Sequence, residues 1–199
     1  MDPVKKFIRP VTGIVALTAV LIEMYVKVST GMTVVQLLSF FTIQSNIIVA
    51  VYCFASMRKQ KFILNSSGFF GLALLNITIT GVIFFLLLRN IYQPEGISYL
   101  TNIMLHYITP ILMLLVFVVI RDRRPFEYKY VVYWMLYAAA YLGYSMARGA
   151  VIGTYPYPFI DLTKLSFGQV AVNSVSIAAA FGVIALLFVV IDRRVSGSR

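Results

Sequence analysis

Two residues of this chain have the chemistry of a nucleophile and its general base. Thr42 lies in the segment FFTIQSN, and His106, the only histidine, lies in the segment LHYITP. A threonine hydroxyl is a weak nucleophile at its own pKa, and an adjacent general base activates it. Imidazole is well matched to this task because its reference pKa is about 6.5. We therefore predict that Thr42 attacks a substrate and that His106 takes the hydroxyl proton, provided that the two side chains meet.

The residues that follow Thr42 are polar at helical spacing. Ser45 and Asn46 lie three and four positions after Thr42, so a helix places all three on one face. Asn46 is a candidate to donate an amide N–H to a developing oxyanion. Ser45 shares the face and is therefore an alternative nucleophile. Packing is also an open interpretation for each residue, because Ser, Thr and Asn often form hydrogen bonds between membrane helices.

The surroundings of His106 favour a kinked helix. Pro110 lies four positions later and has no N–H, so the carbonyl of His106 loses its helical partner. Asn102 lies one helical turn before His106, on the same face. No carboxylate is an obvious partner for the imidazole, and Glu23 and Asn102 are the candidates to orient it. A kinked helix that buries a hydrogen-bonded histidine without a catalytic role is the other interpretation.

Other polar residues are predicted to line the same site. Arg148 is expected at the rim as an anchor for a substrate carboxylate, although snorkelling to the membrane surface explains it equally well. Asn173 is expected to support the site from the last helix. Glu23 and Lys27 are four positions apart, which fits a local ion pair. Residues at intervals of three or four form a stripe on the fifth predicted span: Tyr130, Tyr133, Tyr137, Tyr141, Tyr144 and Arg148. Such a stripe is typical of packing as well as of ligand contact. Its last two tyrosines are candidate substrate contacts.

The elements that carry these residues are predicted to be membrane-spanning helices. The chain has 199 residues, of which 60% are hydrophobic and 12% charged, and its mean hydropathy is +0.88. Soluble domains are about half apolar and about a quarter charged, so this composition indicates an integral membrane protein. A span needs about 20 mostly apolar residues. The segments that qualify are 10–28, 33–57, 68–92, 98–120, 128–149 and 167–191. The predicted fold class is therefore all-α, a polytopic membrane protein with a single six-helix bundle over residues 1–199.

The distribution of basic residues predicts the orientation of the spans. Four of the 17 Lys and Arg residues fall on one side, namely Lys27, Arg89, Arg148 and Lys164, and the other 13 fall on the opposite side. Loops rich in Lys and Arg stay in the cytoplasm. We therefore predict a multi-pass protein of the cytoplasmic membrane with both termini in the cytoplasm. The net charge of +10 follows from this asymmetry, so no nucleic-acid partner is expected.

This orientation places polar residues from several spans in the outer half of the membrane. With a rise of about 1.5 Å per residue, Thr42 lies about 14 Å, His106 about 12 Å and Asn173 about 10 Å below the outer ends of their spans. Polar groups inside a membrane usually face a bundle interior or a water-filled cavity. We therefore predict a pocket that opens to the extracytoplasmic side.

No metal or organic cofactor is expected. The chain contains one histidine and one cysteine, Cys53, which cannot supply the usual set of ligands of a zinc site. Two alternatives to catalysis use the same pocket: a lipid or small-molecule binding or transport protein, and a haem protein with His106 as an axial ligand. The sequence lacks the inverted repeat and the paired broken helices that are typical of secondary transporters. The oligomeric state is not predicted.

Three segments resemble the bacterial branch of the six-helix androgen-induced-gene family: FFTIQSN, LHYITP and ARGAVIGTYPYPFID. The resemblance covers most of the chain and keeps the six spans. It implies an intramembrane threonine hydrolase, because the animal members cleave fatty acid esters of hydroxy fatty acids with a threonine nucleophile and a histidine. The family threonine matches Thr42, and the family histidine matches His106. Membrane lipids and a fatty-acyl ester substrate are the partners that the resemblance implies.

Overall fold

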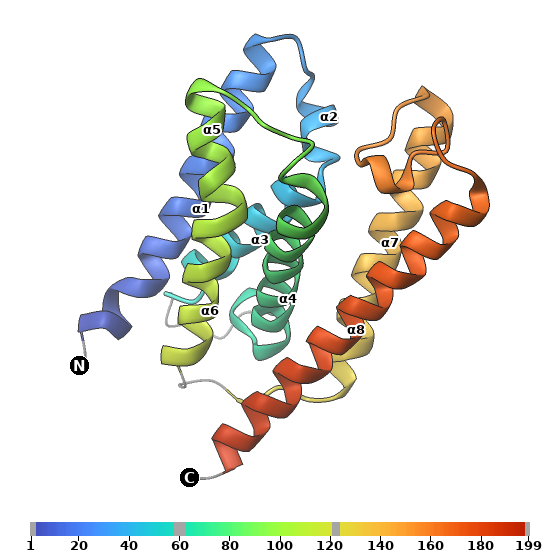
Figure 1. Cartoon of the computed structure of the whole chain (residues 1–199). Coiled ribbons are helices and arrows are strands. Elements are labelled where there is room, and N and C mark those ends of the chain that lie inside the picture. Colours follow the sequence, from blue (N-terminus) through green and yellow to red (C-terminus); the bar gives the residue numbers. More distant parts are fainter. Residues whose placement is uncertain (1–2, 58–62, 121–123, 198–199) are drawn as a thin grey trace. The chain divides into compact units, whose positions relative to one another are not determined.

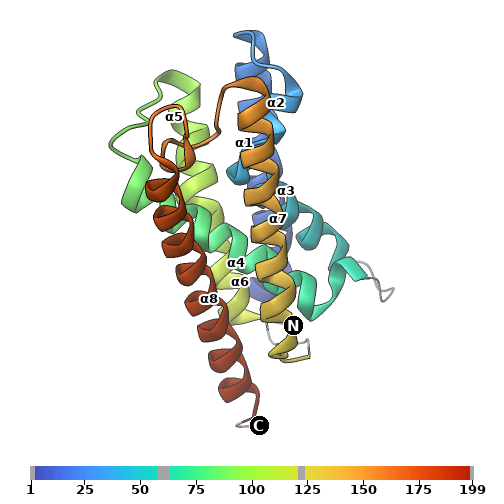
Figure 2. The same cartoon turned by 90° about the vertical axis from the view of Figure 1, so that its right-hand side faces the viewer.

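The computed structural model describes residues 3–57, 63–120 and 124–197, and these residues form helices and no strands. The prediction of an all-α fold is confirmed for this part of the chain. The chain divides into two compact units, Met1–Arg124 and Pro125–Arg199, which are described separately (Figures 1 and 2). Some of the basic residues behind the predicted orientation lie outside the described residues: Arg58, Lys59, Lys61, Arg121, Arg123 and Arg199.

The first unit is built from long helical segments that run alternately in opposite directions (Figure 1). In chain order these elements are α1 (Pro3–Ser29), α2 (Val34–Leu38), α3 (Phe41–Ala55), η1 (Ile63–Asn65), α4 (Ser67–Ile83), η2 (Phe84–Leu88), α5 (Gly96–Ile103), η3 (Met104–Ile108) and α6 (Thr109–Val119). Both α1 and α4 pack against α3 and α6. The η3 turn also contacts α3, so two segments that are far apart in the sequence lie side by side.

The second unit is a pair of antiparallel helices with a loop between them (Figure 2). Helix α7 (Lys129–Ile152) leads through η4 (Pro158–Ile160) to α8 (Phe167–Gly197), and α7 packs against α8. The backbone N–H of Phe126 donates to Oδ2 of Asp192 at 2.8 Å. This bond ties the start of the unit to the last turns of α8.

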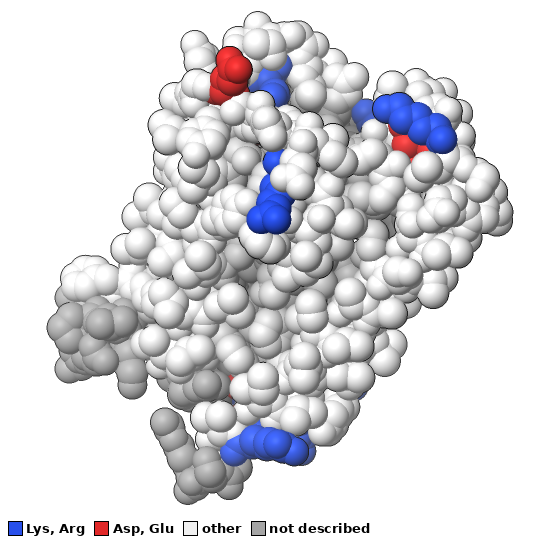
Figure 3. Space-filling model, viewed as in Figure 1, with Lys and Arg blue, Asp and Glu red and all other residues white. Residues whose placement is uncertain are grey.

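Four helical stretches of the described residues are long and apolar enough to cross a membrane: Phe7–Ser29, Ser67–Leu88, Gly96–Val119 and Phe167–Ser196. They correspond to the first, third, fourth and sixth predicted spans. On the face shown in Figure 3, charged side chains lie toward the helix ends, and the surface along the middle of the helices is uncharged. These features suggest a membrane-embedded protein. Helix α7 covers the fifth predicted span, but its tyrosines make it less apolar than the other four.

The second predicted span, 33–57, consists of two helices rather than one. Phe40 has an extended backbone (φ −79°, ψ 130°), so α2 ends at Leu38 and α3 begins at Phe41. A break of this kind leaves carbonyl groups without helical donors. The side chain of Gln44 compensates, because its Nε2 donates to the carbonyl of Leu38 at 2.9 Å. The polar glutamine within an apolar segment is thus explained by the break.

The helix around Pro110 is distorted, in agreement with the loss of a helical donor. Residues Met104–Ile108 form a π-helical turn in which the N–H of Thr109 donates to the carbonyl five residues before it. His106 lies in the middle of this turn. Gly81 of α4 faces it closely, since a Cβ atom at Gly81 would lie 3.1 Å from the carbonyl oxygen of His106 and 3.2 Å from Cγ of Pro110. The glycine therefore allows α4 to approach the widened turn.

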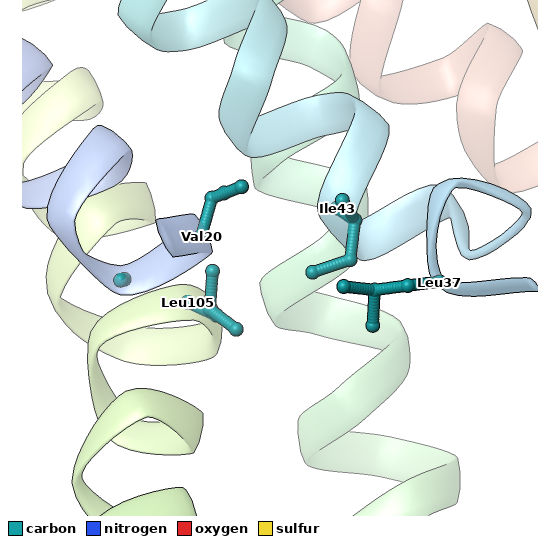
Figure 4. Packing of buried hydrophobic residues seen from close by; sticks show 5 residues of the cluster. Val20, Leu37, Ile43 and Leu105 are labelled. Atoms are coloured by element: carbon teal, nitrogen blue, oxygen red, sulfur yellow. The ribbon is translucent and has the colours of Figure 1, made fainter. Parts of the chain in front are cut away.

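A small apolar cluster joins several elements of the first unit (Figure 4). Its buried members are Ala19, Val20, Leu37, Ile43 and Leu105. They come from α1, α2, α3 and η3, so one cluster joins four elements. Ile43 follows Thr42 in the chain, and Leu105 precedes His106. The packing of these two side chains therefore fixes the backbone on which the two predicted catalytic residues sit.

Candidate active site

Thr42 and His106 meet in the first unit. Oγ1 of Thr42 lies 3.2 Å from Nε2 of His106, and Nδ1 of the same ring lies 3.1 Å from the backbone carbonyl of Asn102. A carbonyl oxygen can only accept a hydrogen bond, so we assign the ring proton to Nδ1. Nε2 is then the acceptor, and the threonine hydroxyl donates to it. The pair has the tautomer that a general base for this hydroxyl requires.

The imidazole ring of His106 is held on its face as well as at both nitrogens. The residue is buried. Phe84, the first residue of the π-helical turn η2, stacks on the imidazole with ring centroids 4.0 Å apart and an interplanar angle of 23°. Phe84 also meets the ring of Tyr107 edge-on. Two π-helical turns, which are frequent at functional sites, thus face each other across these rings and limit the rotation of the imidazole.

Thr42 lies in the first turn of α3, which is a direct result of the helix break before Phe41. The helix dipole gives this end of α3 a partial positive charge. Thr42 is half-buried. A carbonyl attacked by this hydroxyl would therefore develop its negative charge near the positive end of a helix, which is a favourable place for it.

Asn46 and Ser45 lie further along the same face of α3. Nδ2 of Asn46 donates to the carbonyl oxygens of Thr42 at 2.9 Å and of Leu105 at 3.3 Å. Asn46 thus joins the backbone of the predicted nucleophile to the backbone beside His106. The hydroxyl of Ser45 is buried and has no hydrogen-bond partner among the described residues. The contact with the imidazole is made by Thr42, which favours Thr42 over Ser45 as the nucleophile.

A buried carboxylate lies next to the segment that orients the imidazole. Oε2 of Glu23 accepts a hydrogen bond from the hydroxyl of Thr101, and Oε1 lies 3.7 Å from Nζ of Lys27. Thr101 directly precedes Asn102, whose carbonyl accepts from His106. Glu23 therefore holds the turn of α5 that orients the base, and the group in contact with the imidazole is the carbonyl of Asn102.

The remaining predicted site residues belong to the second unit: Tyr141, Tyr144, Arg148 and Asn173. Nη1 of Arg148 donates to the carbonyl of Thr154 at 3.5 Å. Nδ2 of Asn173 donates to the carbonyl of Phe159 at 2.9 Å. Within their own unit, Arg148 and Asn173 thus contact the loop between α7 and α8. Their role as substrate contacts, and that of the two tyrosines, stays a prediction.

Sequence reasoning missed Phe84 and the helix break. Phe84 belongs to the apolar run FFLLL, which carries no signal for a partner of a histidine. The break does have a signal, since Gln44 is a polar residue with no obvious partner in an apolar run. The capping box of Thr33 and Gln36 marks the start of α2 but not its early end.

Comparison with protein-family models, with curated proteins and with solved structures finds no match for this chain. The resemblance to the androgen-induced-gene family therefore rests on the three sequence segments quoted above. Over the residues that it describes, the structure adds an all-helical fold with four membrane-length helices and a threonine–histidine pair.

Proposed function

We propose that this protein is an intramembrane hydrolase that cleaves ester bonds of lipid-like substrates, with Thr42 as nucleophile and His106 as general base and acid. The observation that supports it most directly is the contact between Oγ1 of Thr42 and Nε2 of His106 at 3.2 Å, with Nδ1 of the ring 3.1 Å from the carbonyl of Asn102. A hydroxyl, a base and a group that orients the base are the parts of an activated nucleophile.

The reaction proceeds in two halves. Oγ1 of Thr42 attacks the ester carbonyl carbon while its proton moves to Nε2 of His106, and the carbonyl oxygen becomes an oxyanion. The tetrahedral intermediate collapses, the bond to the alcohol oxygen breaks, and that oxygen takes the proton from Nε2. Water then attacks the acyl-threonine, giving its proton to Nε2. The second intermediate releases the carboxylic acid, and the proton on Nε2 returns to Oγ1. General base catalysis of this kind contributes about 10²–10⁴-fold.

A fatty-acyl ester is the substrate class that fits best. The proposed nucleophile and base are carried by a unit whose α1, α4–η2 and α5–α6 stretches are long and apolar enough for a membrane. A substrate with a long apolar body partitions into the lipid phase and meets such helices there. The sequence resemblance implies fatty acid esters of hydroxy fatty acids. We propose esters of this kind, and not water-soluble esters, as the natural substrates.

We also propose that the chain crosses the cytoplasmic membrane six times and keeps both termini in the cytoplasm. The four membrane-length helices supply four of the crossings. The other two are the broken pair α2–α3 and the tyrosine-rich helix α7. The 13-to-four distribution of basic residues supports the orientation. In the proposed orientation, the Thr42 end of α3 lies in the extracytoplasmic half of the membrane.

Covalent labelling with a fluorophosphonate probe, read by intact mass, tests the catalytic proposal. We expect an adduct on the wild-type protein that is lost in both Thr42→Ala and His106→Ala, with folding checked by thermal unfolding. An adduct that persists in Thr42→Ala but still requires His106 would move the nucleophile to a neighbour such as Ser45. A folded wild-type protein that takes up no probe and hydrolyses no acyl ester would contradict the proposal.

A non-catalytic lipid or small-molecule binding or transport protein is the second candidate, and the break between α2 and α3 favours it. Discontinuous helices are used by membrane transporters to place helix ends at a ligand. For such a protein, the wild type and the Thr42→Ala variant would bind a fatty-acyl ester with equal affinity, and both would release the ester unchanged. Equilibrium binding and product analysis on the same Thr42→Ala sample therefore distinguish the two candidates.

A further inference from the structure

We propose that the side-chain carboxamide of Asn102 is the oxyanion-binding group of the Thr42–His106 pair and therefore a catalytic residue. This inference rests on the proposed hydrolase function and deepens it. It gives Asn102 two separate tasks, since the backbone carbonyl orients the imidazole and the side chain stabilises the negative charge on the substrate.

The first observation is the state of the carboxamide itself. Asn102 is 8% exposed, and its side-chain oxygen has no hydrogen-bond partner among the described residues. Leaving a buried polar atom without a partner costs about 1–3 kcal/mol, and a hydrogen bond to a substrate would remove this cost. The oxygen and nitrogen of a carboxamide exchange places by a half-turn about the last side-chain bond. The position with no partner can therefore present an N–H donor to a substrate.

The second observation is the place of Asn102 relative to the reacting atoms. It lies one helical turn before His106 and on the same face, and its backbone carbonyl contacts Nδ1 of that ring. The opposite edge of the ring, Nε2, points at Thr42. The base and the carboxamide therefore share one face of the α5–η3 helix, and the base of that face contacts the threonine that is proposed to attack the substrate.

The third observation concerns Asn46, the other candidate for the oxyanion donor. Oδ1 of Asn46 also has no partner among the described residues, but Nδ2 of Asn46 already donates to two backbone carbonyls, those of Thr42 and Leu105. Donating to an oxyanion would break one of these bonds. Of the two amides, Asn102 is thus the one that is available to a substrate.

Helix α3 adds to the same effect. Thr42 is the second residue of this 15-residue helix, so the positive end of the helix dipole lies at the nucleophile. When Oγ1 of Thr42 bonds to the ester carbon, the π electron pair moves onto the carbonyl oxygen. That oxygen then accepts the N–H of Asn102 beside the first turn of α3. Donors that are fixed before the reaction stabilise the charge without reorganisation.

The test uses purified full-length protein and a p-nitrophenyl acyl ester, with kcat and KM determined separately. We expect Asn102→Ala to lower kcat about 10²–10³-fold, the usual loss for one oxyanion donor, with KM almost unchanged. Asn102→Asp keeps the shape and removes the donor, so we expect a loss at least as large. This second variant also covers the possibility that alanine leaves a cavity that impairs folding.

Thr78→Val is the matched control. Among the described residues, the Thr78 hydroxyl bonds only the carbonyl of Leu74 in its own helix, so the Thr78→Val variant should keep wild-type kinetics.

An alkyl boronic acid provides a readout that a purely structural role would not change. Addition of Oγ1 of Thr42 to boron gives a tetrahedral anion that mimics the oxyanion, so its affinity should fall in Asn102→Ala by the same factor as kcat/KM. The inference would be overturned if the folded Asn102→Ala variant kept both kcat and boronate affinity while the Thr42→Ala variant lost both. Esterase activity that survives in Thr42→Ala would instead overturn the proposed function itself.

Discussion

The hydroxyl of Thr42 donates to Nε2 of His106 at 3.2 Å, although 64 positions separate the two residues in the chain. The tautomer that allows this bond is set by a backbone carbonyl, that of Asn102. In the serine hydrolases with a catalytic triad, a buried carboxylate performs the same task. A carbonyl carries no full charge, so its burial costs less free energy than that of an unpaired carboxylate inside a membrane. A backbone carbonyl can therefore orient the imidazole at a lower cost of burial than a carboxylate in direct contact with it.

Removal of the threonine hydroxyl should abolish hydrolysis without unfolding the protein. Thr42→Val keeps the shape of the side chain and removes the nucleophile. Loss of base-assisted attack alone lowers a rate about 10²–10⁴-fold, so the activity should fall by this factor or more. Thr42→Ser keeps a hydroxyl and should retain measurable turnover. Ester hydrolysis and thermal unfolding of both variants check this. Equal activity in Thr42→Val and the wild type would exclude Thr42 as the nucleophile.

The stack of Phe84 on His106 should matter for rate more than for substrate affinity. Phe84→Leu removes an aromatic contact worth about 0.5–1.5 kcal/mol beyond its buried area and frees the ring to rotate. We expect kcat to fall about tenfold, which corresponds to about 1.4 kcal/mol, with KM unchanged. The matched control is Phe85→Leu, since Phe85 is exposed and meets only the guanidinium of Arg89 in the described contacts. Similar kinetics for the two variants would remove the role assigned to the stack.

Gly81 should be required for the close approach of α4 to the distorted turn. A methyl group there would meet the carbonyl of His106 at 3.1 Å and Cγ of Pro110 at 3.2 Å. Overpacking of this kind costs about 1–3 kcal/mol, so Gly81→Ala should lower both the unfolding temperature and kcat. Gly143→Ala is the control, because nothing lies within 4 Å of its added methyl group. Its unfolding temperature should stay the same or rise, since alanine favours helix.

Much of the fold and the central pair could be predicted from the sequence. The length and apolarity of the segments around Ala19, Leu74, Val116 and Val189 place them in helices, because hydropathy is a local property of a segment. His106 could also be anticipated as the base, since it is the only histidine, whereas the choice of Thr42 among the many Ser and Thr residues of the apolar segments rested on the family resemblance. The actual contact between Thr42 and His106 depends on the cluster that holds the neighbouring residues Ile43 and Leu105 together with α1 and α2, which no local pattern reveals.

The details that the sequence did not predict depend on tertiary structure. Asn46 appeared to be the oxyanion donor because it shares a helical face with Thr42, but its amide donates across to the carbonyl of Leu105 on another helix. Of the two candidates to orient the imidazole, Glu23 and Asn102, the contact is made by Asn102, and it is made by the backbone carbonyl rather than by the side chain. Backbone groups are the same at every position, so a sequence cannot show which of them will act.

The loop between α7 and α8 should loosen in acid. The hydrogen bond from the hydroxyl of Thr163 lowers the pKa of the Asp161 carboxyl, and the backbone N–H of Thr163 and the charge of Lys164 act in the same direction. A carboxyl whose pKa is lower in the folded protein stabilises the fold above its unfolded pKa, about 3.9. That contribution is lost as the pH falls through the folded pKa.

Hydrogen exchange of the amides of residues 161–165 measures this change. Exchange should accelerate as the pH falls below about 3.9 and through the lower folded pKa, beyond the intrinsic effect of pH, as expected when a carboxylate is protonated. Asp161→Asn removes the titrating group and should show no such step. A step of equal size in both proteins would assign the transition to another group.

The proposed topology predicts that the two ends of α8 face opposite sides of the membrane. Lys164 lies just before this helix and Arg194 near its end, and both are exposed. In a Cys53→Ser background, a membrane-impermeant maleimide should label Lys164→Cys on intact cells and Arg194→Cys only after permeabilisation. Each substitution removes a single charge, which leaves the strong excess of Lys and Arg on the cytoplasmic side. Labelling of both positions from the same side would mean that α8 does not cross, and the reverse pattern would invert the orientation and place Thr42 in the cytoplasmic half.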